Sequence, residues 1–173
     1  MARKTLERLD YYGARNWFWI RTAIWMVPAA LISVMAHFVY TDGLFETVGA
    51  RVAAAALGGC GSVLLAALAG CITMQLTWMR FGWRISFVLN PPACALIAAL
   101  LTVITCGIIM TFLKSSPPDP VGRKAEYDAW LGGIERIYEL MVFSTGASAF
   151  WGFIFGSWFA MRRDKYFIEP FLG

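Results

Sequence analysis

The chain has 173 residues, of which 59% are hydrophobic and only 15% are charged, and its mean hydropathy is +0.61. Soluble domains carry about 25% charged residues, so this composition excludes an ordinary soluble domain and favours an integral membrane protein. The net charge of +4 does not indicate nucleic-acid binding, because the Lys and Arg residues form no sustained run.

Four segments are long and apolar enough to cross a membrane as helices. They are residues 22–40, 52–78, 93–113 and 140–161, and none of them contains Asp, Glu, Lys or Arg. A helix rises about 1.5 Å per residue, so roughly 20 residues cross a hydrocarbon core of about 30 Å. We therefore predict an all-α protein in which residues 1–173 form a single membrane domain with four transmembrane helices.

The residues between the spans indicate where the helices begin and end. The sequence Thr-Asp-Gly at 41–43 is predicted to end the first helix, and SSPPDP at 115–120 is predicted to turn the chain after the third. Asn90, followed by Pro91 and Pro92, has the pattern of an N-cap with proline in the first helical turn. We therefore expect the third span to open at this point.

Small residues recur every four positions on two of the spans. The row in the second span is Ala54, Gly58, Ser62, Ala66 and Gly70, and the row in the fourth is Ser144, Ser148, Gly152, Gly156 and Ala160. Helices gain no hydrophobic energy by meeting in lipid, so they associate through close backbone approach, which small side chains permit. We predict that both rows pack helices. The fourth-span row would meet either the second span or a neighbouring protein, with lipid or a flat apolar cofactor against the aromatic residues around it.

The segment before the fourth span is predicted to be an amphipathic helix. Its apolar face includes Tyr127, Trp130, Leu131 and Ile134, while charged residues occupy the other face. We expect this helix to lie at the membrane interface or to lead directly into the fourth span, with Gly132 and Gly133 loosening it midway. The same apolar face is a candidate docking surface for another subunit.

The two ends of the chain carry their own expectations. The basic N-terminal segment is expected to lie on an anionic membrane face. The C-terminal tail is rich in apolar residues, among them Phe167, Ile168 and Phe171, so we expect it to be held in place. The apolar stretch from Thr22 is longer than the hydrophobic region of a signal peptide, so we expect no cleavable leader.

Groups that carry chemistry are sparse. His37 is the only histidine and lies near the end of the first span, where a hydrogen-bonded or interfacial role is the simplest interpretation. The cysteines fall inside the second and third spans, with no CxxC motif, and we interpret them as small packing residues; they are Cys60, Cys71, Cys94 and Cys106. We find no catalytic constellation, and we predict no metal site and no bound cofactor within the chain.

These observations favour a non-catalytic accessory subunit of a larger integral membrane complex, with other membrane subunits and lipids as its partners. One alternative is a small homo-oligomeric transporter or channel, with a path lined by Thr73, Gln75, Thr77, Thr102 and Thr105. Another is a redox subunit whose cofactor ligands come from other chains. An accessible polar cavity at the bilayer midplane would favour the transporter.

The orientation follows from the distribution of Lys and Arg. Ten of them lie at the termini and in the loop around Arg80 and Arg84, against five in the other two loops. The positive-inside rule then predicts that both termini lie on the cytoplasmic side of a bacterial cytoplasmic membrane or on the matrix side of a mitochondrial inner membrane.

We predict from this orientation that a cysteine introduced as Ser116→Cys reacts with an impermeant thiol reagent added to the outer face. Disruption of the membrane should not be needed for labelling. Labelling from the cytoplasmic or matrix face alone would reverse the assignment.

Overall fold

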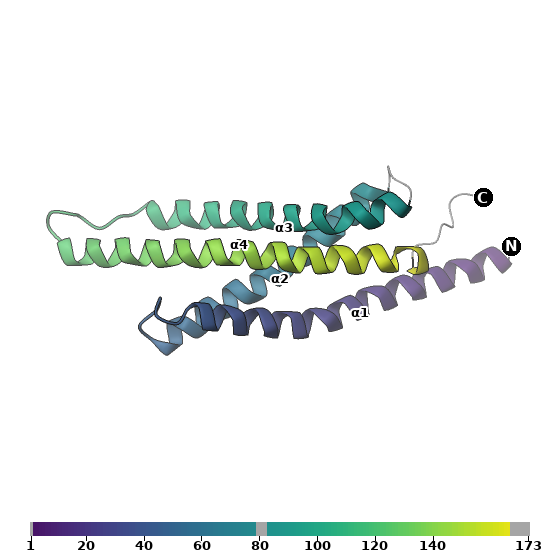
Figure 1. Ribbon diagram of the computed structural model, residues 1–173, viewed down its shortest axis with the longest axis horizontal. Coiled ribbons are helices and arrows are strands. Elements are labelled where there is room, and N and C mark those ends of the chain that lie inside the picture. Colours follow the sequence, from purple (N-terminus) through teal and green to yellow (C-terminus); the bar gives the residue numbers. More distant parts are fainter. Residues whose placement is uncertain (1, 79–82, 167–173) are drawn as a thin grey trace.

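The computed structural model describes the backbone of residues 2–78 and 83–166, and the side chains of residues 20–73 and 88–160. The regular structure in this part of the chain is helical (Figure 1) and consists of α1 (Ala2–Tyr40), α2 (Val48–Trp78), α3 (Trp83–Lys114) and α4 (Lys124–Tyr166). All four helices contain a segment long and apolar enough to cross a membrane; these are Ile20–Tyr40, Val48–Thr73, Val88–Lys114 and Lys124–Ala160. The prediction of an all-α protein with four candidate spans is confirmed.

The helices are arranged around the contact between α3 and α4, which is the most extensive in the molecule. In Figure 1, α4 lies between α3 and α1, while α2 runs obliquely behind them and contacts all three. The contact between α1 and α4 is much smaller, so these two helices are splayed along part of their length. The start of α1 and the end of α4 lie at one end of the molecule (Figure 1).

Two of the expected helix limits agree with the structure. Helix α1 ends at Tyr40, and Gly43 then adopts a φ of +84°, a left-handed conformation that favours glycine. Helix α3 ends at Lys114, and the proline-rich segment that follows separates it from α4. In that segment Asp119 Oδ1 accepts a hydrogen bond of 3.0 Å from the backbone N–H of Val121.

The start of α3 differs from the expectation. The helix begins at Trp83, so Asn90, Pro91 and Pro92 lie inside it rather than at its first turn. Proline in a helix interior removes a backbone hydrogen bond and crowds the carbonyl four residues earlier. Membrane helices tolerate this where a neighbour accommodates the altered backbone. Here the neighbour is Gly156 of α4, whose missing side chain leaves room for the backbone of Pro91.

The segment before the fourth span leads directly into it, which is one of the two arrangements expected. Residues 124–139 form the first turns of α4 without a break, and Gly132 and Gly133 do not interrupt them, so a separate amphipathic helix is not confirmed. Helix α1 is likewise continuous from Ala2, so the N-terminal segment extends the first span. The tail at 167–173 lies outside the described residues.

The α3–α4 contact depends on two glycines of the fourth-span row. A methyl group added at Gly152 would lie 2.9 Å from the carbonyl oxygen of Cys94, and one added at Gly156 would lie 2.8 Å from that of Asn90. Heavy atoms do not normally approach so closely, so any side chain at these positions would force the helices apart. The sequence suggested the second span as the intrachain partner of this row, but these glycines meet α3 instead.

Helices α1 and α2 approach each other in a similar way at Gly59. A methyl group at this position would lie 2.6 Å from both the Cα and the backbone N of Val34. The neighbouring residues Ala55 and Val63 are also buried. Gly59 is outside the row of five small residues predicted for the second span, so α2 has small residues on two adjacent faces.

We predict that Gly156→Ala lowers the free energy of unfolding by about 1 to 3 kcal/mol, because its methyl group would overpack the α3–α4 contact. The matched control is Gly107→Ala on α3, where an added methyl group meets no other atom within 4 Å. There alanine should leave stability unchanged or raise it by up to about 1 kcal/mol. Unfolding in detergent, followed by circular dichroism, measures both. Equal stabilities for Gly156→Ala and the unmodified chain would contradict the packing role.

Candidate functional site

A buried histidine lies where α1, α2 and α4 meet. His37 is fully inaccessible to solvent, with Nδ1 2.7 Å from the carbonyl oxygen of Ser33 and Nε2 3.1 Å from Oγ of Ser144. A carbonyl oxygen can only accept, so Nδ1 carries a proton and donates it. In the neutral ring, Nε2 then accepts from the Ser144 hydroxyl. His37 therefore links α1 to α4 through a side chain that is hydrogen-bonded at both nitrogens.

Two residues of α2 complete this arrangement, which we call the His37 cluster (His37, Gly58, Ser62 and Ser144). A methyl group at Gly58 would lie 2.6 Å from Cδ2 of His37, so the imidazole ring occupies space that only glycine leaves free. The Ser62 hydroxyl lies 2.7 Å from the carbonyl oxygen of Gly58 and 3.2 Å from that of Ser144. The cluster thus joins three helices by hydrogen bonds.

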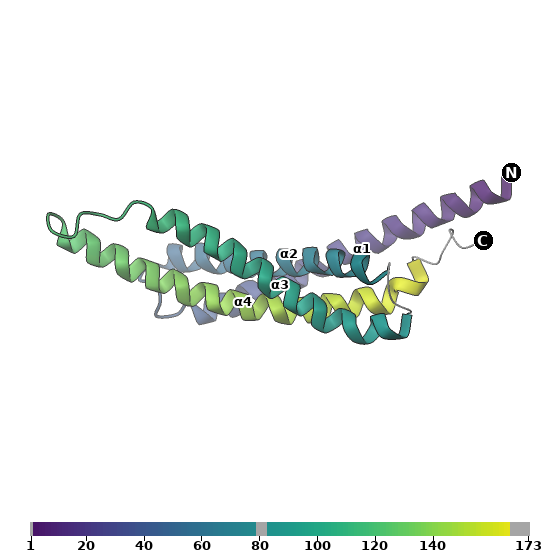
Figure 2. The same ribbon diagram turned by 90° about the horizontal axis from the view of Figure 1, so that it is seen from above.

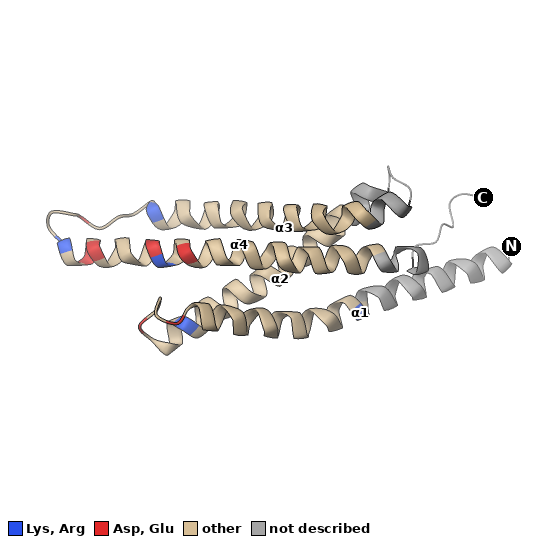
Figure 3. Ribbon diagram, in the orientation of Figure 1, with Lys and Arg blue, Asp and Glu red and all other residues tan. Residues whose placement is uncertain are grey.

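Aromatic rings lie next to the cluster. The ring of Phe143 contacts His37 edge-on at a centroid distance of 4.8 Å, and Tyr40 stacks on Phe143 at 4.1 Å. Beyond them Arg51 pairs with Asp42 at 2.9 Å and lies over the ring of Phe38. Apart from Arg21, at the start of the apolar segment of α1, the described charges lie at this end of the molecule and around the start of α4 (Figure 3).

Three of the residues proposed for a transport path, Thr73, Thr102 and Thr105, have described side chains, and each of these is hydrogen-bonded within the chain. Thr102 is buried, with Oγ1 2.7 Å from Oγ of Ser148 on α4, whereas Thr105 is exposed on the outside of α3 and bonds to the carbonyl of Leu101. Thr73 is buried and bonds to the carbonyl of Ala69. The side chains of Gln75 and Thr77 lie outside the described residues.

The cysteines occupy different environments. Cys94 is fully buried at the centre of the bundle, with Sγ 3.7 Å from the carbonyl oxygen of Ala66, while Cys71 and Cys106 are partly buried. Cys60 is exposed on the outside of α2, so it is not a buried packing residue within this chain. Among the side chains that the structure describes, no group of three or more His, Cys, Asp or Glu residues could hold a metal ion.

The remaining residues of the two small rows are buried, except at one end of each row. Ala66 and Gly70 of α2 are buried, and Gly70 contacts the ring of Phe159. Ser148 is buried against α3, whereas Ala54 and Ala160, at the ends of their rows, are only partly buried. The fourth-span row therefore faces α1 and α2 at Ser144 and faces α3 from Ser148 to Gly156.

Of the four candidate docking residues, one is buried within the chain. Ile134 is buried and lines a small pocket with Met110 and Lys114 of α3. Tyr127 and Trp130 are partly buried, and their rings lie 5.6 Å apart. Leu131 is exposed. The part of this face that is open to a partner is therefore smaller than the sequence suggested.

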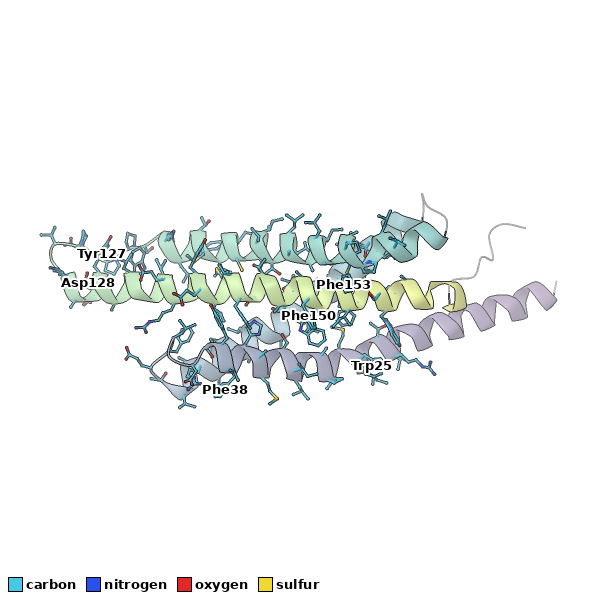
Figure 4. All side chains as sticks on the ribbon, in the orientation of Figure 1. Trp25, Phe38, Tyr127, Asp128, Phe150 and Phe153 are labelled. Carbon is cyan, nitrogen blue, oxygen red and sulfur yellow. The ribbon has the colours of Figure 1, made fainter. Side chains whose placement is uncertain are left out.

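An apolar groove follows the splayed helices α1 and α4. It consists of two pockets that share Ile32 and Trp151. The first has a volume of about 320 Å³ and is lined by Trp25, Pro28, Ala29, Ile32, Trp151, Ile154, Phe155 and Trp158. The second, of about 380 Å³, is lined by Ile32, Ser33, Ala36, Val142, Phe143, Gly146, Ala147, Phe150 and Trp151. We call the two pockets together the α1/α4 groove. Figure 4 shows aromatic side chains, Phe150 among them, between the two ribbons.

A row of buried residues on α1 was not identified from the sequence. The buried residues Ala29, Ser33, His37 and Thr41 recur every four positions and face α2 and α4. That spacing was the available signal. It was hidden because these residues are of mixed type and the surrounding span is uniformly apolar.

The fold defines the chain as a multi-pass α-helical membrane protein. No protein-family model matches the chain, and no curated protein or solved structure does either.

We predict that the His37–Ser144 hydrogen bond contributes about 0.6 kcal/mol of coupling between α1 and α4, and at most about 1.7 kcal/mol, which are the average and the maximum for such bonds within membranes. A double-mutant cycle with His37→Phe and Ser144→Ala, measured by unfolding in detergent, gives this term. The control cycle replaces Ser144→Ala with Ser157→Ala, because the Ser157 hydroxyl bonds within its own helix. The control coupling should be near zero, and a null result for the first pair would contradict the assignment.

Proposed function

We propose that this chain is a non-catalytic subunit of a larger integral membrane complex. The observation that carries the proposal is the use of its buried polar side chains. His37, Ser62 and Ser144 bond to one another and to the backbone of neighbouring helices, and Thr102 bonds to Ser148. Side chains used in this way hold helices together and are not free to carry a substrate or ion.

The chemistry of the spans supports the same proposal. Ion carriers and membrane enzymes place ionisable groups at depth despite the cost of burying charge in hydrocarbon. The four predicted spans contain no Asp, Glu, Lys or Arg. Large apolar side chains cover the outside of the helices instead; among the most exposed are Val39, Leu57 and Phe112. Such a surface suits lipid and the helices of other membrane subunits.

The charged end of the molecule offers a place for a partner outside the hydrocarbon. Arg136 of α4 reaches Glu46 of the α1–α2 loop at 3.5 Å, and Arg51 holds the same loop through Asp42. The Arg136–Glu46 pair is solvent-exposed and contributes little to stability, whereas the Arg51 side chain is mostly buried. Together the two pairs set the loop beside α4. We propose that Leu131 and the adjacent rings of Tyr127 and Trp130 contact another subunit here.

Extraction from the native source into nanodiscs tests this function. An affinity tag on the chain should retain defined integral membrane proteins in a fixed ratio. The protein mass of the particle should then equal the sum of different subunits and not a whole-number multiple of the chain's own 19.3 kDa. Substituting Leu131→Glu should reduce partner retention without unfolding the chain, whereas Val121→Glu, at another exposed apolar residue, should not.

Two results would contradict the proposal. A particle that contains only copies of this chain would favour the homo-oligomeric transporter. A monomeric particle, with all activity of the source membrane retained after the chain is deleted, would remove the subunit role altogether.

A further inference from the structure

A polar pocket lies between the end of α3 and the first turns of α4. One amino group and two carboxylates line it, those of Lys114 on α3 and of Glu135 and Glu139 on α4. Figure 3 shows the basic end of α3 beside acidic turns of α4. The other lining residues are Met110, Ile134 and Tyr138. We call this site the Lys114 pocket.

The opposite charges in the Lys114 pocket are not paired with one another. In the part of the chain that the structure describes, Lys114 forms no ion pair with Glu135 or Glu139. The adjacent Arg136, in contrast, reaches Glu46 at 3.5 Å. All three side chains of the pocket are exposed, so their charged ends are accessible. The pocket can therefore receive a group that carries both charges.

The Lys114 pocket lies at the level of the lipid headgroups. Lys114 directly follows the charge-free segment 93–113, and Glu139 directly precedes the charge-free segment 140–161. Tyr138 is 61% exposed, and tyrosine is enriched at membrane–water interfaces. The end of α3 is on the same side of the molecule as the α1–α2 loop (Figure 1). Phospholipid headgroups are therefore the charged molecules that this pocket meets in the membrane.

Apolar surface continues from the pocket into the membrane. Met110 lies one turn below Lys114 on the same face of α3, and the exposed Val103 follows two turns further along. On α4 the exposed Val142 lies one turn below Tyr138. The acyl chains of a lipid whose headgroup occupies the pocket therefore have apolar side chains of both helices to contact.

The charges of the pocket select among headgroups. An anionic phospholipid would bring a phosphate beside two carboxylates without a cation for them. A free divalent cation would be repelled by Lys114, and among the described side chains no third His, Cys, Asp or Glu completes a metal site. A zwitterionic headgroup, in contrast, supplies a phosphate for the lysine and an ammonium for the carboxylates.

The lining also distinguishes between the two common zwitterionic headgroups. Quaternary ammonium groups are recognised by cages of aromatic rings, whereas this pocket has one ring, that of Tyr138. Carboxylates suit a primary ammonium instead, because it donates three hydrogen bonds. The chemistry of the pocket therefore favours ethanolamine over choline.

We propose that the Lys114 pocket binds a zwitterionic phospholipid with a primary ammonium, phosphatidylethanolamine. Lys114 binds the phosphate, Glu135 and Glu139 accept hydrogen bonds from the ammonium, and the acyl chains follow α3 and α4 into the bilayer. This is a lipid-binding site, and it does not depend on the subunit role proposed above.

The test uses the purified chain in nanodiscs that contain equal amounts of phosphatidylethanolamine and phosphatidylcholine with identical acyl chains. Native mass spectrometry counts the lipids that stay bound when the chain is released. Phosphatidylethanolamine should be retained about three- to tenfold more than phosphatidylcholine, the effect of roughly one net hydrogen bond. Both headgroups have the same net charge, so this ratio measures N–H donation by the ammonium.

Variants of the charged residues assign the preference to the pocket. Glu135→Gln combined with Glu139→Gln should remove it, because neutral amides are weaker partners for the ammonium. Lys114→Gln should lower the retention of both lipids, since both carry the phosphate. Glu126→Gln, the matched control, removes an exposed carboxylate of α4 outside the pocket and should keep the preference.

A series of lipids tests the same site without any variant. Mono- and dimethylated ethanolamine headgroups should be retained to intermediate extents, because each methyl group replaces one N–H donor. Equal retention of all four headgroups by the unmodified chain would overturn the proposal. A preference that survives the double glutamine substitution would place the recognition elsewhere and overturn it as well. Unchanged retention in Lys114→Gln would contradict the phosphate contact, with the same consequence.

Discussion

Helices in a lipid bilayer gain no hydrophobic energy by meeting, so this chain can hold together only where backbones come close enough for van der Waals contact. The positions of closest approach lack side chains: Gly152 and Gly156 face α3, and Gly59 faces the backbone of Val34. The rest of the arrangement follows from these contacts. Because α3 and α4 are drawn together and α2 lies against both, α1 is left with α2 as its principal neighbour and opens away from α4.

Close approach also brings polar groups within reach of one another across the helices. Ser62 meets the carbonyl of Ser144, and the thiol of Cys94 meets the carbonyl of Ala66. Each such bond contributes little to stability in a membrane, where the separated helices find other partners. The bonds are directional, however, and van der Waals contact is not. The His37 cluster therefore specifies which faces of α1, α2 and α4 meet, in a bundle whose apolar surfaces alone would allow several arrangements.

The four spans could be predicted from the sequence because the cost of charge in hydrocarbon acts on each segment separately. The beginning of α3 could not. Whether Pro91 lies in a first turn or in a helix interior depends on the room left by Gly156, 65 positions later. The chemistry of His37 could be anticipated as hydrogen bonding, but its partner Ser144 is on another helix, and no local pattern connects the two. The Lys114 pocket appears only when α3 and α4 lie side by side.

Helix α4 has 43 residues and α1 has 39, which correspond to roughly 65 Å and 58 Å, about twice the thickness of a hydrocarbon core. The excess lies at opposite ends, because the first turns of α4 extend past α1 and α2 at one end and the first turns of α1 extend past the other helices at the opposite end (Figure 2). Each of these two helices therefore has one end that projects beyond its neighbours. The projecting turns of α4 and Gly156 belong to one continuous helix, so a change in the tilt of those turns would also displace the α3–α4 contact.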